Sequence, residues 1–126
     1  MRNEIEAVRN WHKKFCVPIK NVPEIPADRV EMRHNILQEE VNELHEAMMA
    51  GNKEQTLDAL CDIIFVVFGT ALETGLAGCL PEAFDEVYYS NMSKLDENGN
   101  PIVREDGKIL KSNLFRKPNL KHFLKP

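Results

Sequence analysis

Apolar side chains recur at helical spacing in four stretches of the chain. They predict helices over about residues 2–15, 28–50, 52–75 and 81–94. The connector between the first two stretches contains Pro18, Pro23 and Pro26, which exclude a helix there because proline does not fit a helix interior. We therefore expect an all-α protein built on four helices.

Residues with capping preferences mark the expected helix ends. The second helix should begin at Asp28, with Glu31 three positions on as in a capping box, and should stop at Gly51. Asn52 is suited to cap the third helix, and Pro81 suits the first turn of the fourth.

Turn-forming residues follow the fourth predicted helix. The segments DENGNP and EDGK flank short Ile-Val and Ile-Leu pairs, which we expect to form a small hairpin. The tail beyond has no clear periodicity, and we expect it to lie across the surface or on a partner subunit. At 126 residues the chain has the length of one domain, 1–126, which we divide into a helical body (1–94) and a basic hairpin and tail (95–126).

The second predicted helix has two distinct faces. Its apolar positions fall within about 60° of one another on a helical wheel and are Val30, Leu37, Val41, Leu44 and Met48. The adjacent sector carries Glu39, Glu40, Glu43 and Glu46, and Glu40 lies nearest the apolar stripe. A solvated acidic face is the commoner interpretation of such a run, so this spacing alone does not establish a site.

The third predicted helix is apolar on nearly every side from Ala59 to Leu72, as expected of a central, buried helix. Asp62 nevertheless lies within it, and Asp58 lies one turn earlier on the same face. A buried carboxylate without a partner costs several kcal/mol, and the local sequence supplies no lysine or arginine. Asp62 therefore needs a partner from elsewhere.

Two kinds of partner would stabilise Asp62. One is a divalent metal shared with the glutamates of the second helix, and the other is a salt bridge to Arg29 or Arg33. A metal held by carboxylates alone would be a hard cation, Mg²⁺ with Mn²⁺ as the alternative. Zinc would need nearby His or Cys, and a di-iron bundle would need two Glu-x-x-His pairs, of which only Glu31 with His34 is present.

The net charge of -4 hides an uneven distribution. Residues 1–90 carry 8 basic and 16 acidic side chains, and residues 91–126 carry 8 basic and 4 acidic ones. An acidic body is a poor partner for duplex DNA, since a phosphate backbone requires a continuous basic face. The combination of carboxylates and a basic tail suits a metal-bound polyphosphate.

The remaining features indicate a cytoplasmic protein. The three cysteines, Cys16, Cys61 and Cys79, have no zinc spacing, and we expect buried thiols in a reducing compartment. The N-terminus lacks the apolar segment of a signal peptide. The longest uncharged run, Ile63 to Leu72, is well short of the ~20 residues of a membrane span, so we expect no membrane association.

The chain resembles the MazG-like all-α nucleoside triphosphate pyrophosphohydrolases, a group that includes phosphoribosyl-ATP pyrophosphohydrolase. The resemblance is carried by the helix pair ILQEEVNELHEA and LDALCDIIFVVFGTALETG, joined by GNKEQT. A small bacterial and phage subgroup is similar also in the N-terminal WHKKFCVP and the C-terminal SNMSKLDENGNPIVREDGKILK. The likeness spans roughly residues 8–120 and implies a four-helix MazG-like bundle.

The resemblance also implies which residues form the site. The E-x-x-E pair of the group maps onto Glu40 and Glu43, and the Asp of its E-x-x-D pair maps onto Asp62. The Glu of that second pair is replaced by Ala59, and Asp58 is the substitute on the same face. The expected metal ligands are Glu40, Glu43, Asp58 and Asp62. The expected catalytic residues are Glu39 and Glu40.

The activity that the resemblance implies is Mg²⁺-dependent hydrolysis of a (deoxy)nucleoside triphosphate between its α- and β-phosphates. The products would be a monophosphate and pyrophosphate, and the role would be removal of unwanted nucleotides. Lysine and arginine are phosphate-binding side chains, and the C-terminal block supplies the expected substrate-binding residues Asn91, Lys94, Arg104 and Lys108. Solvated surface charges are the alternative interpretation of these cations.

A helix that is apolar on all sides requires more covering elements than this short chain supplies. We therefore expect a homodimer, or a dimer of dimers, with a bundle core shared across a two-fold axis. Trp11 and Phe15 should pack the first helix onto the bundle, and His12 should lie at the surface.

Two other functions remain open from the sequence. Phosphoribosyl-ATP pyrophosphohydrolase is the enzymatic alternative, and it differs only in substrate. A non-catalytic helical module that binds nucleotide or a partner protein is the alternative from another class, because a family ligand is missing at Ala59.

Overall fold

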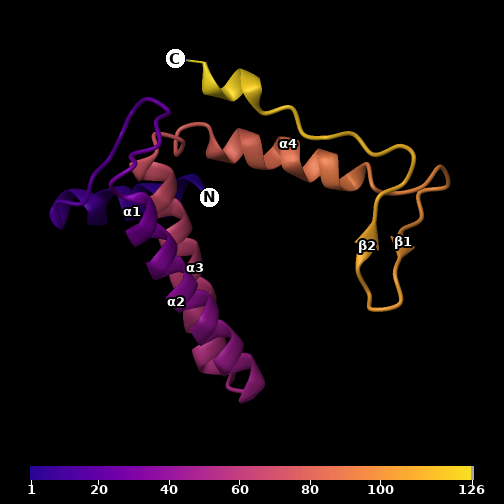
Figure 1. Cartoon of the computed structure of the whole chain (residues 1–126), viewed down its shortest axis with the longest axis horizontal. Coiled ribbons are helices and arrows are strands. Elements are labelled where there is room, and N and C mark those ends of the chain that lie inside the picture. The colour runs from indigo at the N-terminus through magenta and orange to yellow at the C-terminus, as the bar shows by residue number, and fades with distance from the viewer. Residues whose placement is uncertain (126) are drawn as a thin grey trace. The chain divides into compact units, whose positions relative to one another are not determined.

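The computed structural model describes residues 1–125 and is predominantly helical (Figure 1). The helices are α1 (Arg2–Lys14), α2 (Val30–Met49), α3 (Lys53–Glu73) and α4 (Leu80–Met92). The strands are β1 (Ile102–Val103) and β2 (Ile109–Leu110), followed by a 3-10 helix, η1 (Lys121–Leu124). The predicted all-α class is confirmed. The chain forms two compact units, Met1–Gly78 and Cys79–Lys125, which are described separately.

Three predicted helix boundaries are confirmed. The side chain of Asn52 caps α3 by accepting a hydrogen bond of 2.9 Å from the backbone N–H of Gln55. Gly51 follows α2 with a φ of +64°, a conformation in which glycine carries no steric penalty. Pro81 lies in the first turn of α4, where its missing N–H removes no helical hydrogen bond.

The predicted cap at Asp28 is wrong. α2 begins at Val30, and no side chain caps its first turn. The chain instead enters α2 through a backbone turn, in which the N–H of Arg29 donates to the carbonyl of Pro26 at 2.9 Å. Asp28 thus lies too early in the chain to serve as the cap.

Unit 1 is built around α3, with α1 and the antiparallel α2 packed against it (Figure 1). Small side chains lie where α2 and α3 approach, and Ala47 and Ala59 are each only 3% exposed. The rest of the core joins α1 to the C-terminal half of α3 and includes Ile5, Val8, Phe68, Ala71 and Leu72. This packing fixes the α2–α3 pair on which the carboxylates lie.

The third helix was expected to be central and to need more covering elements than the single chain supplies, and α3 is only partly buried in the single chain. Its N-terminal half and middle expose large apolar side chains, which are Leu57, Leu60, Ile64, Phe65 and Val67. Three of the five residues in the predicted core stripe of α2 are exposed as well, with Val30 at 45%, Val41 at 42% and Met48 at 63%, whereas Leu37 and Leu44 are half-buried. In unit 1 only α1 and α2 pack against α3, and they do not cover all of its sides. Unit 1 therefore keeps an extensive apolar surface.

Trp11 packs α1 against α3 as expected, whereas Phe15, which follows α1, is 64% exposed, and His12 is not at the surface. Trp11 stacks on Phe15 at a centroid distance of 4.6 Å and meets the edge of Phe65 on α3 at 5.5 Å. His12 is buried, at 1% exposure, and its Nδ1 lies 3.1 Å from the carbonyl of Pro18. Because that carbonyl can only accept, Nδ1 carries the hydrogen. Burial is the main cause that lowers the pKa of His12.

Unit 2 contains α4, the hairpin and the tail. The predicted hairpin is confirmed: Ile102 pairs with Leu110 and Val103 with Ile109 in an antiparallel register.

The tail runs back along α4 and is held by side chains of that helix. Ser90 donates to the carbonyl of Arg116 at 2.8 Å. Glu86 accepts from Nη1 of Arg116 at 2.7 Å and from the N–H of Asn119 at 3.0 Å. These bonds lower the pKa of Glu86. The tail therefore lies across a surface of its own unit, one of the two placements expected.

The expectation of buried thiols is wrong for two of the three cysteines. Cys16 and Cys61 are exposed, Cys79 is half-buried, and within residues 1–125 none of the three forms a disulfide. By length and composition alone, α3 is also the one helix within residues 1–125 that could cross a membrane. Core helices of soluble proteins meet the same criterion, so the expected absence of membrane association stays a prediction.

Candidate metal centre

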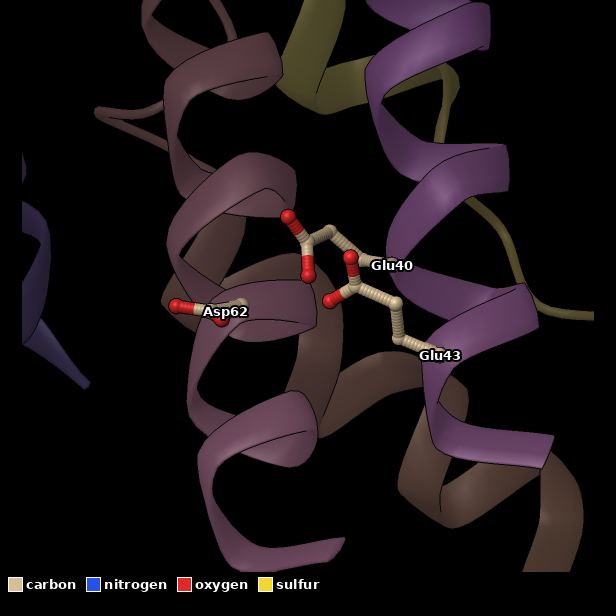
Figure 2. Close-up of side chains that lie close together, drawn as sticks. All are labelled: Glu40, Glu43 and Asp62. Atoms are coloured by element: carbon tan, nitrogen blue, oxygen red, sulfur yellow. The ribbon is translucent and has the colours of Figure 1, made fainter. Parts of the chain in front are cut away.

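Three predicted ligands come together midway along the α2–α3 pair. Glu40 and Glu43 reach from α2 toward α3, which carries Asp62 (Figure 2). One carboxylate oxygen from each of the three lies within 4.8 Å of the others. The spacing explains the convergence: Glu40 and Glu43 are three residues apart on one helix, and the antiparallel pairing sets Asp62 opposite them.

Glu40 belongs to this cluster, and no positively charged side chain within residues 1–125 pairs with its carboxylate. Its Oε2 is buried and has no hydrogen-bond partner among the described residues. Burial, followed by the charges of Glu43 and Asp62, raises the pKa of Glu40 from 4.5 to about 7. A half-buried carboxylate beside two others is costly unless a cation or a proton neutralises it.

The other two predicted acids lie outside the tight cluster. Asp58 is exposed and does not belong to the three carboxylates within 4.8 Å, although its charge adds to the raised pKa of Glu40. Glu39 is exposed and is likewise not brought into the cluster. Ala59, where the family has a glutamate, is buried against α2 and offers no ligand.

The alternative partner for Asp62, a salt bridge to Arg29 or Arg33, is wrong. Both arginines pair with Glu73 near the C-terminal end of α3: Nε of Arg29 lies 2.6 Å from Oε1 and Nη1 of Arg33 lies 2.8 Å from Oε2. Burial by itself would raise the pKa of Glu73, but the hydrogen bonds and charges of the two arginines lower it below its usual value. The acidic cluster is thus left without an arginine partner.

Sequence reasoning missed this network, although a signal for it was present. Glu73 is separated from Asp62 by three turns of the same helix face, and it lies in the predicted apolar helix just as Asp62 does. The same argument that a buried carboxylate requires a partner therefore applied to Glu73, and here the arginines are that partner.

The four predicted substrate-binding residues all belong to unit 2. Asn91 lies in the last turn of α4, whereas Lys94 lies just beyond the helix, its N–H donating to the carbonyl of Asn91 at 3.2 Å. Arg104 and Lys108 flank the hairpin turn. The side chain of Arg104 pairs with Asp106, with Nε 3.0 Å from Oδ1, so it stabilises that turn. The assignment of these residues to substrate stays a prediction.

The donor set of the cluster fits a hard divalent cation. All three groups are carboxylates, one oxygen is buried without a partner, and Glu43 is exposed, which leaves coordination positions open to water or substrate. A residue such as Glu40, with a pKa near 7, can also accept a proton at neutral pH. The arrangement can therefore hold a metal and serve acid–base chemistry.

Comparison with known proteins gives one family. No curated protein matches the chain in sequence. Residues 8–91 match the phosphoribosyl-ATP pyrophosphohydrolase family, a segment that contains α2, α3 and all three clustered carboxylates. The match covers more than half of the chain and agrees with the helical fold. The chain therefore belongs to the phosphoribosyl-ATP pyrophosphohydrolase family, within the MazG-like all-α nucleoside triphosphate pyrophosphohydrolases.

Proposed function

We propose that this protein is a Mg²⁺-dependent pyrophosphohydrolase that cleaves a (deoxy)nucleoside triphosphate between the α- and β-phosphates. The observation that carries the proposal is the cluster of Glu40, Glu43 and Asp62 with its unpartnered buried oxygen. Family membership supports a pyrophosphohydrolase acting on a nucleotide. The proposed setting is the cytoplasm, where the enzyme would remove unwanted nucleotides.

The residues of the site divide into two roles. Glu43 and Asp62 would hold the cation together with Glu40, and Asp58 would reach it through water. A bound Mg²⁺ would supply positive charge to the phosphates and acidify a water molecule. Glu40 and the neighbouring Glu39 are the candidate proton acceptors for that water.

Phosphoribosyl-ATP is the second candidate substrate, because the family that matches residues 8–91 is named for it. Both substrates present a triphosphate, and the same bond is broken in each. The proposed phosphate contacts are Asn91, Lys94, Arg104 and Lys108, and each carries or flanks positive charge in unit 2. An assay that offers both substrates separates the two candidates.

The test is pyrophosphate release from each common nucleoside triphosphate, its deoxy form and phosphoribosyl-ATP, with Mg²⁺ or Mn²⁺. We expect metal-dependent turnover of at least one, and its loss in Glu43→Gln. Glu31→Gln is the matched control, since Glu31 is an exposed glutamate in the first turn of the same helix. Absence of turnover on every substrate, or full activity of Glu43→Gln, would rule the proposal out.

We also propose that a second copy of the chain covers the apolar surface of unit 1. The exposed stripe of α2 adjoins a cavity of about 280 Å³. Val30 and Leu37 of α2 and Thr70 and Thr74 of α3 line it together with the ion-paired Arg29, Arg33 and Glu73. A two-fold axis would set this face against its own copy and complete a four-helix bundle. The exposed stripe of α2, which includes Val30, Val41 and Met48, supplies the apolar area that such an interface would bury.

Sedimentation at micromolar concentration tests the dimer. We expect twice the 14.5 kDa mass of the chain, or four times this mass for a dimer of dimers. Val41→Lys, which places a charge on the exposed stripe, should yield monomers. A wild-type chain that sediments as a monomer would contradict the proposal.

A further inference from the structure

The ion-pair network at the far end of the α2–α3 pair contains two arginines that bind differently. Glu73 is 0% exposed and accepts from both. The guanidinium of Arg29 contacts this carboxylate through Nε at 2.6 Å and Nη2 at 3.1 Å, and within residues 1–125 it donates to no other group. Arg33 instead spreads its donors over three different groups of α3.

The three acceptors of Arg33 lie on successive turns of α3. Nη2 donates to the backbone carbonyl of Val66 at 2.6 Å, Nε donates to the hydroxyl of Thr70 at 3.0 Å, and Nη1 donates to Glu73 at 2.8 Å. A planar guanidinium holds its donors in a fixed geometry. A slide of α2 by one turn, about 5.4 Å, would therefore separate all three donors from their acceptors.

The same register determines the geometry of the acidic cluster. Glu40 lies seven residues after Arg33, close to two turns, and so on the same face of α2. Asp62 lies eight residues, slightly more than two turns, before Thr70 on α3. In an antiparallel pair, the axial position that places Arg33 on Thr70 therefore also places Glu40 opposite Asp62.

The apolar contacts between the helices define this register only weakly. Ala47 of α2 and Ala59 of α3 are both buried and border the same pocket, and a methyl group gives a partner helix few features that would fix its axial position. Gly69, by contrast, is shaped for the arginine. A Cβ at this position would lie 2.6 Å from Nη2 of Arg33 and 2.9 Å from Nε2 of His12. The guanidinium therefore occupies the one axial site where α3 has no side chain in its way.

We propose that Arg33 is a positioning residue, which fixes the axial register of α2 on α3 and thereby assembles the carboxylates of Glu40, Glu43 and Asp62. Arg29 neutralises Glu73 without specifying the register. The inference rests on the proposed function, because it concerns the metal affinity of that cluster. Arg33 would thus contribute to metal binding as well as to stability.

The test compares Mn²⁺ affinity, measured by calorimetric or EPR titration, in Arg33→Gln and Arg29→Gln. Each substitution removes one positive charge, so electrostatics alone would strengthen cation binding in both. A shifted register would weaken it in Arg33→Gln alone. We expect at least a tenfold loss of affinity in Arg33→Gln, and an affinity in Arg29→Gln within twofold of wild type or tighter. Unfolding midpoints, measured in parallel, identify any variant that does not fold.

A second pair of variants leaves both arginines in place. Gly69→Ala should displace the guanidinium and weaken Mn²⁺ binding severalfold, whereas Gly78→Ala, where an added Cβ meets nothing within 4 Å, should not. This pair decides the question if Arg33→Gln is unfolded. Equal losses in the two arginine variants, or wild-type affinity in Gly69→Ala, would overturn the inference. A wild-type protein that binds no Mn²⁺ would overturn the proposed function, and the inference with it.

Discussion

Two regions of the α2–α3 contact place carboxylates in opposite electrostatic surroundings. At one end Glu73 is completely buried, yet two guanidinium groups hold its pKa below the usual value. Midway along the pair Glu40 is less buried, yet its neighbours are other carboxylates, its Oε2 has no partner among the described residues, and its pKa is raised to about 7.

The comparison shows that compensation, rather than burial, distinguishes a structural carboxylate from a candidate ligand. The charge of Glu73 is balanced by the protein itself, so this residue contributes to folding. The charge of Glu40 is left unbalanced, an arrangement that weakens the fold and is expected where a ligand supplies the missing charge. Substitutions of Glu73, or of Glu40 and its neighbour Asp62, should therefore have opposite effects on stability and activity.

The largest effect is expected from Asp62→Asn. Loss of one ligand charge should reduce pyrophosphate release by about a thousandfold, within the range for metal-assisted and acid–base catalysis. Stability should not fall, since one like charge is removed from beside Glu40. Steady-state rates and thermal unfolding measure the two outcomes. If Asp62→Asn stays active, or unfolds at a markedly lower temperature than wild type, Asp62 contributes to folding as Glu73 does and is not a metal ligand.

Glu73→Gln should show the reverse behaviour. The substitution leaves two arginines around a neutral amide, and breaking a buried ion pair costs about 3–5 kcal/mol of unfolding free energy. Urea unfolding at pH 7 measures this loss. The pKa of Glu73 is lowered in the folded protein, so its contribution is present above the unfolded pKa and disappears as pH falls through the folded value. A wild-type and a Glu73→Gln protein of equal stability at pH 7 would contradict the assignment.

The pH dependence of metal binding should follow Glu40. A proton and a metal compete for this carboxylate, whose pKa is about 7. Mn²⁺ affinity should therefore fall about tenfold between pH 8 and pH 6, as one site titrates over this range. Titrations at three pH values provide the measurement. An affinity that is flat over this interval would show that Glu40 is not a ligand.

The smallest effect expected is a gain in stability from Glu40→Gln without metal. A carboxylate with a raised pKa binds its proton more tightly in the folded state, so stability declines as pH rises from the unfolded pKa toward about 7. Glutamine cannot ionise, and the variant should be more stable by about 1 kcal/mol at pH 8, allowing for solvent screening. The gain should vanish near pH 4. A variant less stable than wild type at pH 8 would indicate that Glu40 is compensated.

Much of the helical framework could be predicted from the sequence, because it depends on local signals. Asn52 caps α3 through a bond to a residue three positions away, and Gly51 needs only its own backbone freedom. Asp28 was mispredicted as a cap because the chain enters α2 through a backbone turn that involves Pro26, which a capping pattern does not encode.

The sequence predicted part of the site, because α2 has an acidic face and α3 carries Asp62 among apolar residues. Glu40, Glu43 and Asp62 were expected as ligands from the family resemblance and from the position of Asp62 within an apolar helix, although the structure leaves Asp62 half-buried. The partnership of Arg29 and Arg33 with Glu73 was not predictable as such, because it joins residues 40 or more positions apart. From the sequence, these arginines could pair with either Asp62 or Glu73. Only the axial register of α2 on α3 determines that the partner is Glu73.

Titration of Mn²⁺ into the wild-type protein, Glu43→Gln and Glu31→Gln at pH 8 tests the central claim most directly. Glu43 is the exposed member of the cluster, so its replacement leaves the fold intact, and Glu31 is an exposed glutamate of the same helix outside the cluster. We predict saturable binding to the wild type and to Glu31→Gln, and its loss in Glu43→Gln. Binding that is equal in all three proteins, or absent from the wild type, would contradict the account.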